Sequence, residues 1–198
     1  MAIDREKIIA EMSKIRVVGN EEGLIPALGV YVQQLPADFW NEFSARMIMS
    51  ETGPVRREIE NMLVLAARDC GYFTGHGIIT SPEWKAIVEP MIDRVPEDVL
   101  YGAYAVFAAW GWADAEIIEL DPHVKMVLRA YSYYEADGAI KAGIKFPFAY
   151  MIRGVSSAFM DLAYGGPYPH GRGKYKCDQT LGLETGDPYG EFVVTKSW

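Results

Sequence analysis

Apolar residues recur at helical spacing through much of the first hundred residues. After the letters "TGP", Gly53 can cap a helix and Pro54 can occupy its first position. Apolar residues then return on one face of that helix, at Val55, Ile59, Met62, Leu63 and Ala66. The pattern predicts a helix that buries this face against the rest of the protein.

Two further helix N-termini are marked by a proline, as the first one is. In "SPEW", Ser81 can cap and Pro82 can begin a helix that buries Trp84, Ile87, Val88 and Met91. Pro96 precedes another apolar series, which Gly111 ends and which comprises Val99, Leu100, Ala103, Val106, Phe107 and Trp110. We therefore expect residues 1–110 to be mainly helical.

The period changes from helical to alternating after Trp112. The stretch "EIIELDPHVKMVLRAYSYY" predicts two strands joined through the turn residues Asp121 and Pro122. In the second strand, Val124, Met126, Leu128 and Ala130 alternate with Lys125, Arg129, Tyr131 and Tyr133. We expect the aliphatic set to face the core and the two tyrosines to share the opposite face.

The last part of the chain predicts a helix and a second hairpin. Pro147 can open a helix whose apolar side carries Phe148, Met151, Ile152, Val155 and Phe159, and "GGPYPHGRGK" reads as a surface loop. Strands are expected around Tyr175–Leu183 and Gly190–Val194. The fold class is then α+β in a single domain over 1–198. Its N-terminal helices pack on a small antiparallel sheet of two hairpins with an intervening helix, residues 111–198.

Composition excludes several classes of protein. Half of the 198 residues are hydrophobic, which suits a globular core, and the formal net charge of -8 disfavours nucleic acid as a partner. No apolar run approaches the roughly 18 residues that cross a bilayer. Cys70 and Cys177 lie far apart and read as free thiols of a reducing compartment. We expect a soluble, cytoplasmic protein that binds neither nucleic acid nor membrane.

The sequence contains no convincing general motif for catalysis or metal binding. The segment "GRGK" lacks the other residues of a phosphate loop, and His76, His123 and His170 are scattered along the chain. Ser156 and Ser157 lie in "GVSSA" inside a predicted helix, where small residues serve close packing. These features favour no particular enzyme class.

Aromatic residues are concentrated between Tyr101 and Tyr150. Phe107 and Trp110 have the helical spacing of core residues, whereas Tyr131 and Tyr133 need either solvent or a second apolar layer. A cavity lined by aromatic rings with a few hydroxyl groups suits a small apolar or phenolic molecule. The sequence thus favours binding of such a ligand.

The order of several short elements resembles one known family. These elements are "SETGPVRREIENML", "WGWADAEIIELD", "SYYEAD", "PFAYMIRG" and "QTLGLETGDPYGEF". Together they resemble the 4-vinyl-reductase or hydrocarbon-binding domain over roughly residues 39–194. That domain is similar to the sensor modules of aromatic-responsive transcription activators and, at fold level, to subunits of the Golgi transport particle. The resemblance implies an α+β fold that holds a hydrophobic or aromatic small molecule.

In that family, the last element and the late helix supply zinc ligands, a Glu and three Cys. Laid onto this chain, the frame "GDP" and the following Phe192 are kept, but the four ligand positions are Gln179, Gly182, Gly190 and Ala149. Since zinc needs three or four anionic or imidazole donors, the resemblance implies a knuckle without metal, and we expect no cofactor. Cys177 precedes Gln179 by two residues and could offer only one sulfur. Alternatively, the likeness of this segment to the zinc-binding element arises by chance, and "TGDP" is an ordinary turn.

The resemblance implies a pocket between the aromatic helix, the second strand and the helix from Pro147. Its expected ligand-binding residues are Trp110, Tyr131, Tyr133, Tyr150, Phe107 and Phe148. Fold alone does not fix function, so two alternatives stay open.

The first alternative is a cofactor-independent hydrolase or lyase for a small aromatic or carboxylate substrate. Tyr150, Arg153, Ser157 and Asp161 fall on one stripe of a helix. Arg153 could clamp a carboxylate, with Glu135 or His76 as acid or base. The competing interpretation is that Arg153 and Asp161 are ordinary surface or interface charges.

The second alternative is an assembly module. Relatives of this fold pair through their N-terminal helices, and the apolar helices of the first hundred residues exceed what one small sheet can cover. We therefore expect a homodimer whichever function applies.

Overall fold

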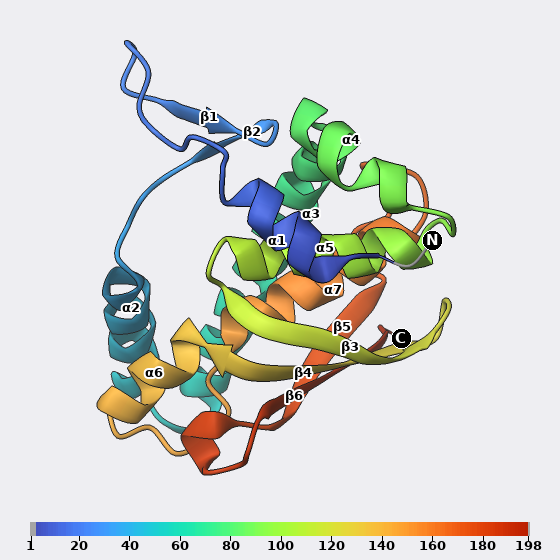
Figure 1. Cartoon of the computed structure of the whole chain (residues 1–198). Coiled ribbons are helices and arrows are strands. Elements are labelled where there is room, and N and C mark those ends of the chain that lie inside the picture. Colours follow the sequence, from blue (N-terminus) through green and yellow to red (C-terminus); the bar gives the residue numbers. More distant parts are fainter. Residues whose placement is uncertain (1–2, 198) are drawn as a thin grey trace.

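A four-stranded antiparallel sheet forms one side of the molecule in the computed structural model, which describes residues 3–197 (Figure 1). Its strands lie in the order β3-β4-β6-β5, so the two predicted hairpins join through the β4–β6 pair. The strands are β3 (Ala113–Asp121), β4 (Lys125–Tyr133), β5 (Tyr175–Leu181) and β6 (Gly190–Lys196). The predicted α+β class with two hairpins is confirmed.

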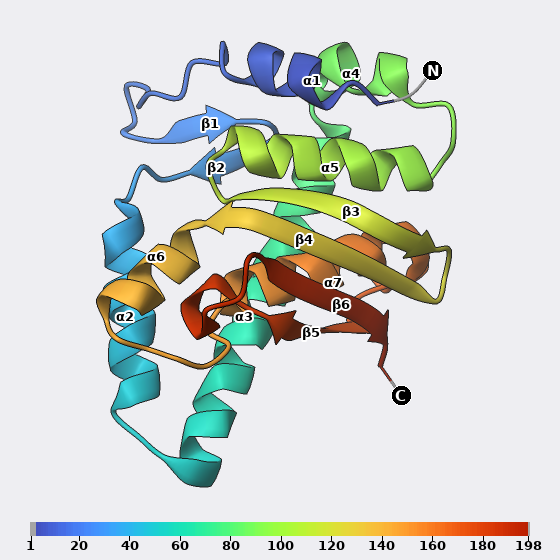
Figure 2. The ribbon, with the colours of Figure 1, turned by 60° about the horizontal axis from the view of Figure 1, so that its bottom comes forward.

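Two helices cover one face of this sheet, α5 (Glu97–Ala109) and α7 (Tyr150–Tyr164). Figure 2 shows α5 running along β3 and α7 behind the strands. The apolar sides of both helices meet the inward side chains of the strands in the main core. This core includes Leu100, Tyr104, Phe107, Met126, Leu128, Ile152, Val155, Phe159 and Phe192. Helix α7 begins at Tyr150 rather than at the predicted Pro147, and Gly111 ends α5 in a left-handed conformation, as expected.

A long helix, α3 (Gly53–Thr80), packs on α7 on the side away from the sheet. Its buried face carries small residues, Ala67, Gly71 and Gly75. The contact is close: a Cβ atom built on Gly154 of α7 would lie 2.6 Å from the Val64 carbonyl oxygen. The prediction of which face of α3 is buried is largely wrong, because Val55, Met62 and Ala66 are exposed.

The other side of α5 is covered by α1 (Arg5–Met12), α4 (Pro82–Ile87) and the short 3-10 helix η1 (Glu89–Met91). Ser81 caps α4, since its Oγ accepts from the Trp84 amide at 3.1 Å. Trp84, Val88 and Met91 are buried, as their spacing predicts. This second core contains the apolar side of α1 as well.

The N-terminal part is mainly helical, as predicted for residues 1–110, but it also contains a short hairpin that the sequence did not predict. A hairpin of β1 (Ile25–Ala27) and β2 (Val30–Val32) precedes α2 (Ala37–Met49). Gly29 turns this hairpin with φ 71° and lies against α3, where a Cβ atom would be 2.6 Å from the Gly77 oxygen. The strands are only three residues each, too short for a visible alternation.

A β-bulge in β4 reverses the expected placement of one tyrosine. Asp114 pairs with Ser132 but Ala115 pairs with Ala130, so Tyr131 is the extra residue. An extra residue shifts the alternation by one. Tyr133 therefore joins Met126 and Leu128 in the main core, and only Tyr131 faces outward, against the prediction that both share the outer face.

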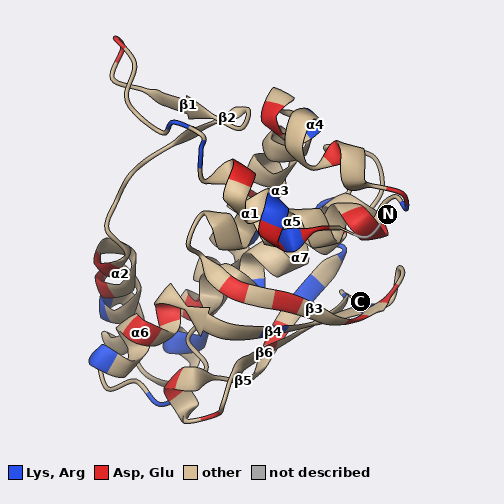
Figure 3. Ribbon diagram, in the orientation of Figure 1, with Lys and Arg blue, Asp and Glu red and all other residues tan. Residues whose placement is uncertain are grey.

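After the bulge, β4 continues directly into α6 (Tyr134–Lys141), which packs beside α2. Acidic and basic residues are interspersed over the ribbon, in line with the absence of a basic run in the sequence (Figure 3). Within residues 3–197, no helix is both long and apolar enough to cross a bilayer.

Candidate functional site

Four positions that are scattered in the sequence meet at one place in the fold, the end of β5 and the start of α7. The Gln179 Oε1 atom accepts a hydrogen bond from the Ala149 amide at 3.1 Å. A Cβ atom on Gly182 would lie 2.6 Å from Gln179 Nε2, and one on Gly190 would lie 3.1 Å from the Tyr133 hydroxyl. The positions aligned with the zinc ligands of the resembled family thus surround one point.

The side chains of Tyr133 and Glu184 occupy the space between these four positions. The Tyr133 hydroxyl donates a short hydrogen bond to Glu184, and it accepts one from the Leu183 amide at 3.1 Å. Glu184 also accepts from the Phe148 amide at 2.9 Å and from Gln179 Nε2 at 2.7 Å. Burial, and secondly the hydrogen bond to Glu184, raises the pKa of Tyr133, so the phenol stays protonated.

This donor set does not fit zinc. It offers one carboxylate, one neutral amide and one phenol, and zinc sites use thiolates, imidazoles and carboxylates. No group of three His, Cys, Asp or Glu side chains suited to a metal occurs in the part of the chain that the structure describes. The turn is instead held by Asp187, which accepts from the Gly182 amide at 2.9 Å and from the Thr185 hydroxyl at 2.7 Å.

Glu135, the expected acid or base, is buried below this network at the start of α6. Its two oxygens accept from the Met151 and Ile152 amides at 2.8 and 3.2 Å, so it caps the first turn of α7. Burial raises the pKa of Glu135 to about 8, although both amide hydrogen bonds oppose this shift. Both oxygens are engaged in a structural contact.

Tyr150 links α7 to α2 rather than lining a pocket. Its hydroxyl lies 2.6 Å from the buried Ser44 hydroxyl, and burial raises the pKa of Tyr150 to about 12. Phe148 is buried beside it in a third core cluster with Ile48 and Leu63. These two predicted ligand-binding residues are thus enclosed by protein.

An aromatic cleft of about 370 Å³ opens where α1, the end of α5 and the ends of the β3–β4 hairpin meet. Its walls include Trp112, Tyr133 and Tyr134, and the Trp112 and Tyr134 rings stand at 85° with centroids 6.2 Å apart. Trp112 rests on the buried Phe107 ring, 5.5 Å away. We call this space the Trp112 cleft.

The rim of the Trp112 cleft is polar and largely acidic. Asp114, Ser132 and Asp137 line it, and Arg5 of α1 pairs with Asp114 at 2.5 Å. The cleft therefore combines an aromatic floor with hydrogen-bond acceptors at the edge. Helix α1 supplies the only cation at this rim among the residues that the structure describes.

A second, more polar cleft of about 250 Å³ lies between α3, α7 and β5. Arg56 stacks over the Phe146 ring at 3.6 Å and pairs with Glu60 at 2.9 Å. Arg153 enters it from α7 and donates to the Cys177 carbonyl at 3.3 Å. Its lining holds two arginines and two carboxylates, Glu60 and Asp178, so the formal charges of the cleft balance.

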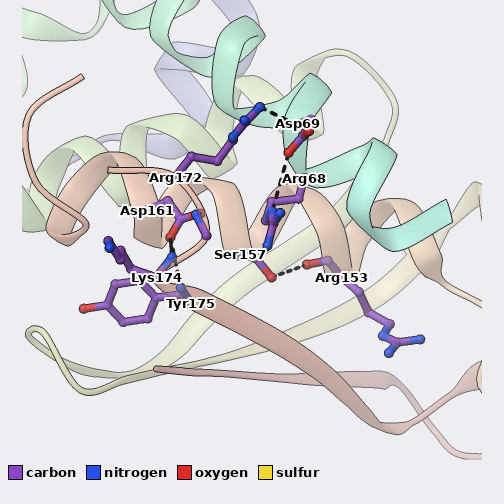
Figure 4. Close-up of polar contacts among 9 residues, drawn as sticks. Arg68, Asp69, Arg153, Ser157, Asp161, Arg172, Lys174 and Tyr175 are labelled. Atoms are coloured by element: carbon purple, nitrogen blue, oxygen red, sulfur yellow. Dashed lines mark hydrogen bonds and ion pairs between the residues drawn. The ribbon is translucent and has the colours of Figure 1, made fainter. Parts of the chain in front are cut away.

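The predicted catalytic set is not brought together. His76 stacks on Tyr168 at 3.5 Å on the far end of α3, away from Glu135 and Arg153. The Arg153 guanidinium points away from Asp161, which lies two turns further along α7 (Figure 4). The stripe inferred for α7 does not form a single site.

Asp161 is a buried anchor, so its interpretation as an ordinary surface charge is wrong. It accepts from the Gly173, Lys174 and Tyr175 amides at 2.7, 2.7 and 2.9 Å (Figure 4). Burial raises its pKa, and these three hydrogen bonds oppose the shift. Asp161 thereby ties the Gly165–Lys174 loop to α7.

The six expected ligand-binding residues are dispersed. Phe107 and Tyr133 share the main core, Tyr150 and Phe148 belong to another cluster, and Trp110 packs toward the α1 and α4 side. Tyr131 is 46% exposed and meets the Tyr189 ring edge-on. Trp112 and Tyr134, which line the Trp112 cleft, belong to the same aromatic-rich stretch of the sequence but are not among these six residues.

Comparison with known proteins gives a likeness of fold. No protein-family model and no curated protein sequence matches the chain. The fold is similar to the phenol-responsive sensory domain of the transcription activator PoxR, solved with phenol. The match has a TM-score of 0.74 and a sequence identity of 9%, and it covers 100% of this chain and 94% of the sensory domain.

The fold is also similar to trafficking protein particle complex subunit 3 from Naegleria fowleri, solved covalently bound to palmitic acid. There the TM-score is 0.54 at 10% identity, over 82% of this chain and 95% of that one. At such identities the likeness shows a shared fold, as the ordered motifs of the sequence led us to expect.

Proposed function

We propose that this protein is a small-molecule-binding module that holds a planar aromatic ligand in the Trp112 cleft. The observation that carries the proposal is the pair of nearly perpendicular rings, Trp112 and Tyr134, at the wall of a cleft of about 370 Å³. Ligand sites are concave, mainly apolar spaces of about 300–1,000 Å³ with a few placed polar groups. The likeness to a sensory domain solved with phenol supports the same function.

The rim determines the kind of ligand. Because Asp114, Asp137 and Ser132 offer oxygen acceptors, a ligand with a hydroxyl or N–H donor gains a hydrogen bond there. A ring without a donor gains only the aromatic contacts. We therefore expect phenols and indoles to bind better than plain hydrocarbons of the same size.

Binding without turnover is the function that we adopt. Glu135 uses both oxygens to cap α7, and His76 lies on another part of the molecule, so neither faces the Trp112 cleft. A general acid or base must reach its substrate within hydrogen-bonding distance. This arrangement favours a binding module over the hydrolase or lyase alternative.

The test is a panel of small aromatics, with tryptophan fluorescence and thermal shift as readouts. We expect binding at about micromolar affinity, corresponding to about 8 kcal/mol. Tyr134→Leu should weaken it at least about tenfold, whereas Tyr131→Leu, on the exposed bulge, should not. If no compound binds, or if both variants behave alike, the Trp112 cleft is not the site.

A further inference from the structure

Asp137 is a carboxylate of the Trp112 cleft that forms no ion pair with any Lys or Arg of residues 3–197. Its side chain is exposed in the first turn of α6. Lys141, one turn further along the same helix, pairs instead with Asp38 of α2 at 3.4 Å. The cleft therefore offers an unpaired negative charge to a bound molecule.

Arg5, the cation at the rim of the cleft, is already engaged. Its guanidinium group lies 2.5 Å from a carboxylate oxygen of Asp114 and 3.3 Å from one of Glu6. Two carboxylates thus share one positive charge, and Figure 3 shows further acidic residues along β3. The surroundings of the cleft are negative, as is the whole chain, whose formal net charge is -8.

The aromatic walls of the cleft also suit a positive charge. The Trp112 and Tyr134 rings stand nearly perpendicular, at 85°, so the cleft is bordered by rings in two orientations. The face of an aromatic ring carries partial negative charge and attracts a cation, most strongly for Trp. A cationic group beside these rings would be attracted by the rings and by Asp137 together.

The size of the cleft allows more than a single ring. An apolar cavity of about 150 Å³ already accommodates benzene, whereas this cleft has about 370 Å³. Small residues leave this space open, since Ala108, Gly111 and Ala113 form part of the lining. A ring with a short side chain therefore fits the volume better than a bare ring.

We propose that the Trp112 cleft selects aromatic amines, in which a planar ring is joined by a short chain to an ammonium group. This inference rests on the proposed function and adds the charge of the ligand to it. The ring would pack against Trp112 and Tyr134, and the ammonium group would pair with Asp137.

The same charges disfavour the other ligand classes. A neutral phenol or alcohol can donate a hydrogen bond at the rim but leaves the charge of Asp137 unpaired. An aromatic carboxylate would meet Asp137 as a like charge and would compete with Asp114 and Glu6 for Arg5. Net charge, rather than the ring, should therefore rank these ligands.

Calorimetric titration of the intact protein with phenethylamine, phenethyl alcohol and hydrocinnamate tests the proposal. These probes share the ring and differ mainly in the charge at the end of the chain. We expect the amine to bind at least about fivefold more tightly than the alcohol, and the carboxylate to bind most weakly. The preference for the amine should shrink when the salt concentration rises from about 0.02 to about 0.5 M.

Two matched variants separate the charge of the cleft from the charge of the whole protein. Asp137→Asn keeps the shape of the side chain and should bring the affinities for the amine and the alcohol close to each other. Asp121→Asn removes the same charge at the other end of β3, away from the cleft. This variant should keep the amine preference of the wild type.

An amine preference that Asp137→Asn abolishes and Asp121→Asn retains supports the inference. Equal affinities for the amine and the alcohol, tighter binding of the carboxylate, or equal effects of the two variants would overturn it. In those cases the aromatic site of the proposed function would still stand. If none of the three probes binds, the proposed function fails and this inference fails with it.

Discussion

The Tyr133 hydroxyl donates a short hydrogen bond to the Glu184 carboxylate inside the protein, joining the end of β4 to the turn between β5 and β6. Glu184 is only 5% exposed, and no Lys or Arg of residues 3–197 forms an ion pair with it. The carboxylate is stabilised by three hydrogen-bond donors, and Tyr133 is one of them.

Removing the Tyr133 hydroxyl should therefore destabilise the fold. Tyr133→Phe keeps the ring but takes one donor from the buried Glu184, which we expect to lower the free energy of unfolding by about 1–3 kcal/mol. Urea denaturation measures the change. Tyr131→Phe, at the exposed bulge, is the matched control and should change stability by less than about 0.5 kcal/mol. Equal effects at the two positions would contradict the role of this hydrogen bond.

Gly190 should tolerate no side chain. A Cβ atom there would lie 2.8 Å from the Tyr133 ring and 2.9 Å from the Phe192 ring, so Gly190→Ala forces two core aromatics to move. We expect a loss of about 1–3 kcal/mol, as for other overpacked cores. Gly19→Ala is the control, because no atom lies within 4 Å of its added methyl group. Unchanged stability of Gly190→Ala would argue against this packing.

Stability should decrease as pH rises from about 5 to about 8. The folded-state pKa of Glu135 is raised to about 8, so in this window the folded chain holds a proton that the unfolded chain has released. Stability then falls with a slope of at most about 1.4 kcal/mol per pH unit. Glu135→Gln cannot ionise and should flatten this slope in urea titrations at several pH values. A slope equal to that of the wild type would assign the pH dependence to other groups.

The purified protein should contain well under one zinc ion per chain. Ala149, Gln179, Gly182 and Gly190 supply no thiolate or imidazole, and Tyr133 occupies the space between them. Elemental analysis after dialysis measures the content, and a chelator should leave the melting temperature unchanged. Stoichiometric zinc that a chelator removes with loss of stability would refute the alignment of "QTLGLETGDPYGEF" with a metal knuckle.

Local signals in the sequence determined most elements of this fold. Ser81 before Pro82, Pro96 before an apolar series, and Asp121-Pro122 between alternating stretches mark starts and turns through backbone chemistry that acts over a few residues. The resemblance to the 4-vinyl-reductase domain, rather than a local signal, aligned Ala149, Gln179, Gly182 and Gly190 with one set of ligand positions. The structure brings these four positions together.

Tertiary packing decided which side of each element is buried. The bulge at Tyr131 depends on how β4 pairs with β3, so alternation alone placed Tyr133 on the wrong face. Helix α3 offered two candidate faces, and close packing against Gly154 selected the small residues over the larger apolar ones. Trp112 and Tyr134 form a cleft only because α1 and the hairpin ends converge there. Such long-range contacts leave no periodic trace in the sequence, and only the folded chain reveals them.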